Sequence, residues 1–245
     1  GNATLRLLAA DAKLHVTATT HSLGVGVLGL GAHRDNALAT AGNVTAAAVN
    51  STIHVITGVN NRGVGVLGFG AHYYARASAR NTTMAAVNTT LHVIAAGNAN
   101  QGVGVLGFGA NSRARATAAH TTATAVNCGM RLNANMNFGI GVLGLGAENH
   151  ADATTGNTTS VAVNTTIHVS ARAGNHGIGV LGLGARATFA HATAGPTTAT
   201  AVNCAVALAT TGGANYGIGV LGAGAETSRA RRTPTTSMST ACSTP

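Results

Sequence analysis

The chain has 245 residues, of which 45% are apolar, but only 3% are aromatic and none is tryptophan, which argues against a globular core of large side chains. Its 34 glycines and three prolines show no Gly-X-Y period, which excludes collagen, and the 8% of charged residues argue against intrinsic disorder. The formal charge of +9 would suit an anionic glycan or surface as a partner. Nucleic-acid binding is disfavoured, because the arginines are scattered and lack interleaved aromatic residues. No apolar run reaches the ~18 residues of a membrane helix.

Three short phrases recur along the chain in a constant order. A strand-like phrase, LHVTAT at residue 14, returns at 53, 91, 130, 167 and 206. A glycine phrase, GVGVLGLGAH at residue 24, returns at 63, 102, 139, 177 and 217, and a third phrase, AAAVNST at residue 46, returns at 84, 123, 160 and 199. The period of 37 to 40 residues predicts a tandem-repeat protein. We expect an N-terminal lead-in, 1–13, and a single repeat domain, 14–245, with repeats 14–52, 53–90, 91–129, 130–166, 167–205 and 206–245.

Each repeat also resembles itself internally, as a comparison of ATAGNVTAAAVN (39–50) with ARAGNHGIGVLG (171–182) shows. Gly and Asn tolerate positive φ, so we predict that they form the corners between short strands. These features predict an all-β solenoid of about twelve coils of ~20 residues in six repeats of ~39 residues, roughly 58 Å long at a coil spacing of about 4.8 Å. The alternative is a six-bladed β-propeller, because six repeats near 40 residues fit its blades.

The glycine phrase would form one wall of such a coil. Val25 and Val27 share one strand parity, and Leu28 and Leu30 share the other. A corner or bulge between Val27 and Leu28 would place all four side chains on one face and the glycines on the opposite face. We expect the four large side chains to point inward, which leaves a glycine face that another chain can approach; the opposite orientation would expose an apolar stripe.

The segment ADATTGNTTSVAVNTTIHVSARAGNHGIGVLGLGARAT (151–188) resembles the head repeats of trimeric autotransporter adhesins. Its small-residue strands and Gly-Asn corners match the units that build a left-handed β-roll in that family. The unit here is longer, asparagine often replaces the family's glycine, and no neck or coiled-coil stalk follows. The resemblance implies a surface-exposed, trimeric rod with an adhesive or ligand-binding role.

Four histidines, His15, His54, His92 and His168, occupy equivalent positions in their repeats. At two coils per repeat they would lie about 9.6 Å apart, too far to share a metal ion. We therefore interpret them as outward residues of half-buried strands, and we expect no metal or cofactor site. The five acids, Asp11, Asp35, Glu148, Asp152 and Glu226, form no recurrent pair, so we expect no enzymatic activity.

Two further sets of residues are candidate modification sites. Cys128, Cys204 and Cys242 occupy equivalent repeat positions, and an odd thiol among the three is a candidate for an intermolecular disulfide. Two coils per repeat would hold Cys204 and Cys242 about 9.6 Å apart within one chain, beyond the roughly 4.4–6.8 Å of a disulfide. One coil per repeat would instead bring them within reach. Sequons predict glycosylation at Asn43, Asn50, Asn81, Asn88, Asn157 and Asn164, although turn chemistry also explains asparagine at corners.

These features together predict a secreted or cell-surface structural protein that self-assembles as a homo-oligomer or fibre, or forms an adhesive surface. The alternative is a binding module, either a glycan-binding propeller or an ice-binding solenoid. Thr-x-Thr occurs at 17–19, 122–124 and 198–200 without a regular repeat, and aromatic residues are few, which weakens both alternatives.

Overall fold

The computed structural model describes residues 4–33, 36–187, 189–212, 214–225, 231–234 and 237–240. All regular elements in this part of the chain are β-strands, and every strand pairing is parallel. The chain winds into a β-solenoid, which confirms the predicted fold class. The propeller alternative is excluded, because a propeller is built of separate blades around a central channel rather than of parallel sheets that run through all repeats.

Each repeat forms one coil. Ile53 pairs with Leu14 in the coil before it and with Leu91 in the coil after it. Six coils at a spacing of about 4.8 Å give a stack about 29 Å high, so the predicted twelve coils and 58 Å length were wrong. Segments 39–50 and 171–182 share a local pattern of strand, corner and strand, but they lie in different sheets and do not stack on each other.

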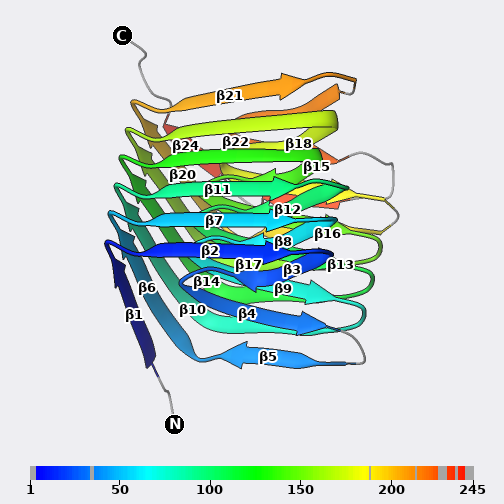
Figure 1. Ribbon diagram of the computed structural model, residues 1–245, viewed down its shortest axis with the longest axis horizontal. Helices are drawn as coiled ribbons and strands as arrows, with labels where there is room; N and C mark the ends of the chain where they lie inside the picture. Colours follow the sequence, from blue (N-terminus) through cyan, green and yellow to red (C-terminus); the bar gives the residue numbers. More distant parts are fainter. Residues whose placement is uncertain are drawn as a thin grey trace.

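Two outer walls enclose the solenoid and meet at a sharp corner (Figure 1). Wall A consists of β1 (Thr4–Ala10), β5 (Leu38–Ala41), β6 (Asn43–Val49), β10 (Arg76–Val87), β14 (Arg115–Val126), β17 (Asp152–Val163), β19 (His191–Ala194), β20 (Thr197–Val202), β23 (Arg231–Pro234) and β24 (Ser237–Thr240). Wall B consists of β2 (Lys13–Ala18), β7 (Thr52–Thr57), β11 (Thr90–Ala95), the first halves of β15 (Gly129–Ile140) and β18 (Thr166–Arg186), and β21 (Ala205–Thr210). Residues 4–10 of the expected lead-in thus form the first strand of wall A.

A strand–turn–strand unit, which we call the inner arch, fills the space between the walls in each coil. The arches are β3 (His21–Val25) with β4 (Leu28–His33), β8 (Asn60–Val64) with β9 (Leu67–His72), β12 (Ala99–Val103) with β13 (Leu106–Asn111), the end of β15 with β16 (Leu143–Glu148), the remainder of β18, and β22 (Ala214–Ala225). Residues 60–72 and 99–111 are buried throughout, which places these arches inside the solenoid. The Ser160 hydroxyl of wall A donates to the Val180 carbonyl of an arch at 2.9 Å.

The glycine phrase forms the arch. In the second coil Val64, Val66, Leu67 and Phe69 are at most 2% exposed, so the prediction that the large residues of the phrase point inward is confirmed. The glycines lie between the two strands of the arch and not on the outside, so the expectation of an accessible glycine face was wrong. A Cβ on Gly107 would lie 2.3 Å from the Gly102 carbonyl oxygen. Only glycine allows the two strands to stack this closely.

The corner between the walls is an asparagine in five coils and Asp11 in the first. Their φ angles are close to 50°, in the left-handed region that Asn and Asp tolerate. The residue after the corner, such as Thr89 or Cys128, donates from its side chain to the carbonyl two residues before it. The corner residues are Asp11, Asn50, Asn88, Asn127, Asn164 and Asn203.

Candidate functional site

The arches bring two rows of side chains together inside the solenoid. One row follows the first strand of each arch and contains Arg62, Gln101, Phe138 and His176. The other follows the second strand and contains His72, Asn111, Glu148 and Arg186. The two rows face each other because the chain reverses direction at the tip of the arch, and Gln101 of the first row contacts Glu148 in the second row of the next coil. Charged residues are otherwise scarce in this protein, so their concentration here marks a candidate site.

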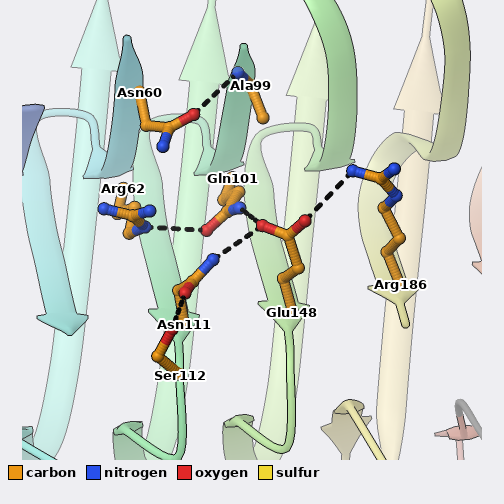
Figure 2. Close-up of polar contacts among 8 residues, drawn as sticks. All are labelled: Asn60, Arg62, Ala99, Gln101, Asn111, Ser112, Glu148 and Arg186. Atoms are coloured by element: carbon orange, nitrogen blue, oxygen red, sulfur yellow. Dashed lines mark hydrogen bonds and ion pairs between the residues drawn. The ribbon is translucent and has the colours of Figure 1, made fainter. Parts of the chain in front are cut away.

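Five residues of these rows form the polar cluster, which consists of Arg62, Gln101, Asn111, Glu148 and Arg186 (Figure 2). Glu148 accepts from Arg186 Nη1 at 3.0 Å, from Gln101 Nε2 at 2.5 Å and from Asn111 Nδ2 at 2.6 Å. The Gln101 carbonyl oxygen in turn accepts from Arg62 Nε at 3.1 Å. The cluster therefore links residues from four consecutive coils.

The polar cluster carries a buried charge. Arg62 is only 2% exposed, and this burial lowers the pKa of its guanidinium to about 10. The nearby Glu148 and Tyr73 oppose this shift. A group with this pKa remains protonated at neutral pH. Glu148 is the carboxylate of the cluster and accepts from three donors, so it stabilises the stack as a structural anion. The cluster pairs no nucleophile with a base, and its geometry supports no catalytic assignment.

A second polar row runs beside the cluster on the first strand of each arch, and we call it the amide ladder. Each of its first four asparagines donates from Nδ2 to the Oδ1 of the next, at 3.0 Å for Asn61 to Asn100 and for Asn100 to Asn137, and at 2.9 Å for the next two steps. The first four are fully buried. The ladder residues are Asn61, Asn100, Asn137, Asn175 and Asn215.

The amide ladder also ties the arches to wall B. Asn61, Asn100 and Asn137 each donate to a carbonyl of the wall, Ile94 O, Asn133 O and Ser170 O respectively. These residues are not among the site residues predicted from the sequence. A signal was present, because asparagine stands two residues before the glycine phrase in five of the six repeats, as N-x-G-[VI]-G-V.

The equivalent histidines lie on the outer face of wall B, as expected, while Ile53, Leu91 and Ile167 beside them are buried. Their predicted spacing was wrong, because one coil per repeat makes them direct neighbours. The His54 and His92 rings stack at 4.7 Å between centroids, and His15 and His54 lie 4.9 Å apart. Arg131 and His168 continue this row. Within the described ranges, no three His, Cys, Asp or Glu side chains are grouped so that they could hold a metal ion.

Cys128 and Cys204 occupy the position after the corner asparagine, and both are free thiols. Their sulfurs lie near Val126 O and Val202 O, as the hydroxyls of Ser51, Thr89 and Thr165 do at this position. Burial raises the pKa of the Cys128 thiol, which lowers its reactivity. Cys242 lies outside the described residues, so the intermolecular disulfide stays a prediction.

The six sequon asparagines lie at the surface in two stacked rows. Asn50, Asn88 and Asn164 are exposed corner residues, and Asn43, Asn81 and Asn157 lie on wall A. Asn88 Nδ2 donates to Asn50 Oδ1 at 3.1 Å and Asn81 Nδ2 to Asn43 Oδ1 at 3.2 Å. These contacts give the asparagines a structural role, and glycosylation stays a prediction.

Among the acids, Asp152 lies on wall A, where it pairs with Arg115 at 3.0 Å and His191 at 3.3 Å. Asp35 and Glu226 lie outside the described residues. Comparison of the chain with protein-family models, curated proteins and solved structures finds no match. No helix in the described ranges is long and apolar enough to cross a membrane.

Proposed function

We propose that this chain is a structural protein of the cell exterior whose coils stack end to end on further copies of the chain. The observation that carries the proposal is the open edge of the first coil. Among the residues that the structure describes, its strands β1, β2, β3 and β4 each pair on one side only, with β6, β7, β8 and β9 respectively. A parallel sheet edge of this kind is a template for another strand.

The backbone groups at this edge point outward. Thr52 N donates to Ala12 O at 2.8 Å and Gly58 N to Ala18 O at 2.9 Å, so these N–H groups face the first coil. Alternate residues of a strand point the same way. The equivalent N–H groups of Lys13, His15 and Thr17 therefore point away from the second coil, where a further coil would accept their hydrogen bonds.

Apolar side chains at both ends also favour stacking. Leu5 aligns with the core residue Val44 but is 42% exposed, against 2% for Val44. At the other end, Tyr216 and Ile218 are 46% and 38% exposed. Solenoids that stay single require terminal coils with a polar outer face. Covering these residues with another copy would remove them from water, and the resemblance to adhesin heads favours placement of the assembly at the cell surface.

Electron microscopy and light scattering over a concentration series test the proposal. Thr17→Pro removes an N–H group that faces outward and should reduce assembly while leaving the coil-to-coil bonds intact. Thr17→Val keeps this N–H group and is the matched control, which should assemble like the original chain. A chain that stays monomeric at every concentration, or a Thr17→Pro variant that assembles normally, would contradict end-to-end stacking.

A second candidate function, ice binding, has its own observation. The outer face of wall A carries a regular array of residues, the Thr-Ala-Val face, without a charged residue. Its threonine row aligns in register through five coils, next to a mixed row of alanine, threonine and valine and a row of valines. The face consists of Thr45, Ala47, Val49, Thr83, Ala85, Val87, Thr122, Thr124, Val126, Thr159, Val161, Val163, Thr198, Thr200 and Val202.

Thermal hysteresis of a dilute solution tests this second candidate. Thr122→Lys places a charge in the centre of the Thr-Ala-Val face and should abolish hysteresis, whereas Thr90→Lys on wall B should leave it unchanged. Hysteresis that is absent from the original chain, or equal in both variants, would remove ice binding as a function.

A further inference from the structure

A hollow interrupts the outer face of wall B at Gly129. Thr52, Thr90 and Thr166 occupy the same row in other coils, and Gly129 replaces the threonine between the last two. A Cβ built on Gly129 would meet nothing within 4 Å, and the φ angle there is not in the left-handed region. An open space of about 400 Å³ lies over Gly129 and its neighbours, and we call it the Gly129 hollow.

Hydrogen-bond donors line the Gly129 hollow. Arg131 lies next to it in the same strand, between His92 and His168 of the adjacent strands, and all three line the space. Thr90 and Thr166 line it from opposite sides. These two threonines stand on strands about 9.6 Å apart, so a small group between them is within reach of both hydroxyls.

The hollow also has a positive electrostatic environment. Burial together with the neighbouring His54 and Arg131 lowers the pKa of His92, which means that a second positive charge is disfavoured beside Arg131. The strands of wall B contain no Asp or Glu residue in their wall segments. Arg131 forms no hydrogen bond or ion pair within the described ranges, in contrast to Arg115 on wall A, which is paired with Asp152.

We propose that the Gly129 hollow binds a tetrahedral oxyanion, a sulfate or phosphate group, either free or as the ester group of an acidic glycan. The Arg131 guanidinium presents planar donors that fit two oxygens of such a group. The hydroxyls of Thr90 and Thr166 donate to it from both sides, and the ring N–H groups of His92 and His168 add further donors, while Arg131 supplies the positive charge. This site is independent of end-to-end stacking, because it lies on the side of the solenoid and is complete within one chain.

Two binding probes test the proposal on the intact chain at a dilute, non-assembling concentration: inorganic sulfate, and a sulfated heparin oligosaccharide with its desulfated counterpart. Calorimetry measures affinity, and amide chemical shifts locate the contact. We expect saturable binding that perturbs the amides of Thr90, Arg131 and Thr166. Binding of inorganic sulfate without binding of the oligosaccharide would identify a site for a free oxyanion. Tighter binding of the sulfated oligosaccharide than of its desulfated counterpart would identify a glycan site.

Three variants separate this site from a general effect of net charge. Gly129→Thr restores the threonine of the row and places a side chain in the hollow between Thr90 and Thr166, and Arg131→Gln removes the guanidinium; each should weaken binding by about tenfold or more. Arg76→Gln removes the same charge from the exposed face of wall A and should bind like the original chain. Thermal melting confirms that all three fold. The proposal is overturned if neither probe binds saturably, if Gly129→Thr binds normally, or if Arg76→Gln weakens binding as much as Arg131→Gln.

Discussion

Two rows of asparagine run along this solenoid, and the same amino acid has a different role in each. In the corner row, represented by Asn88, the backbone has a φ of 48° and the side chain is exposed. In the amide ladder, represented by Asn100, the side chain is fully buried and connects three strands. Corner asparagines are required for their backbone conformation, and ladder asparagines are required for their amide groups.

The difference shows where the stability of this protein lies. A corner on the surface has water as an alternative partner, so the cost of a change there is limited to backbone strain. Inside the arches no water replaces a lost partner, and each unsatisfied polar group carries its full desolvation cost. Substitutions in the arches should therefore destabilise the fold far more than substitutions at the corners.

The largest effect is expected for Gly107→Ala in the arch that carries the amide ladder. The new Cβ would lie 2.3 Å from Gly102 O and 2.6 Å from Val64 O, and both are backbone atoms that cannot rotate away. We expect a loss of more than about 4 kcal/mol in the free energy of unfolding, measured by denaturant titration. Gly129→Ala is the control, because its Cβ meets nothing, and it should stay within about 0.5 kcal/mol.

Asn100→Ala should have the next largest effect. The substitution removes the donor to Asn137 Oδ1 and to Asn133 O and the acceptor for Asn61, and it leaves a cavity. We expect a loss of about 3 kcal/mol in the same titration. Asn100→Gly should be no better, because the required group is the amide. A loss below about 1 kcal/mol would show that the ladder contributes little.

Asn88→Ala at the corner should cost less, about 1–2 kcal/mol, because alanine disfavours the left-handed conformation. Asn88→Gly should recover most of this loss, since glycine adopts positive φ freely. Thermal melting of the two variants measures the difference. If glycine and alanine were equally destabilising at position 88, the amide contact with Asn50 would matter more than the backbone, and the two rows would not differ as proposed.

Cys128→Ser should have the smallest effect. Serine places a hydroxyl near Val126 O, as Ser51 does near Val49 O in its own coil. We expect a change within about 0.5 kcal/mol in thermal melting. Cys128→Leu serves as the comparison, because it cannot donate and is too large for the buried corner. A clear loss for serine would indicate that the thiol itself is required there.

Much of the architecture could be predicted from local patterns. The 37 to 40 residue period and the turn residues predicted an all-β repeat fold. The parity of Val25, Val27, Leu28 and Leu30, with a bulge between Val27 and Leu28, placed these side chains on one face, and the cost of exposing an apolar stripe predicted that this face points inward. Gln101, Asn111 and Glu148 could not be grouped in this way. They come from strands that stack only once the arch has formed, and their sequence separation of 37 to 47 residues follows no common motif.

By itself, the sequence determined the strand class, the six repeats and the positions of the corners, because these depend on side-chain alternation and on the few residues that accept positive φ. Only the tertiary structure decided the number of coils and the place of the glycines. Both depend on which strands pair and which faces meet. The half-repeat pattern is equally compatible with two coils per repeat, in which the two halves stack on each other, and with one coil per repeat. The glycine face, which was expected to be accessible, lies in the close contact between the two strands of the arch. Each repeat therefore forms one coil and not two.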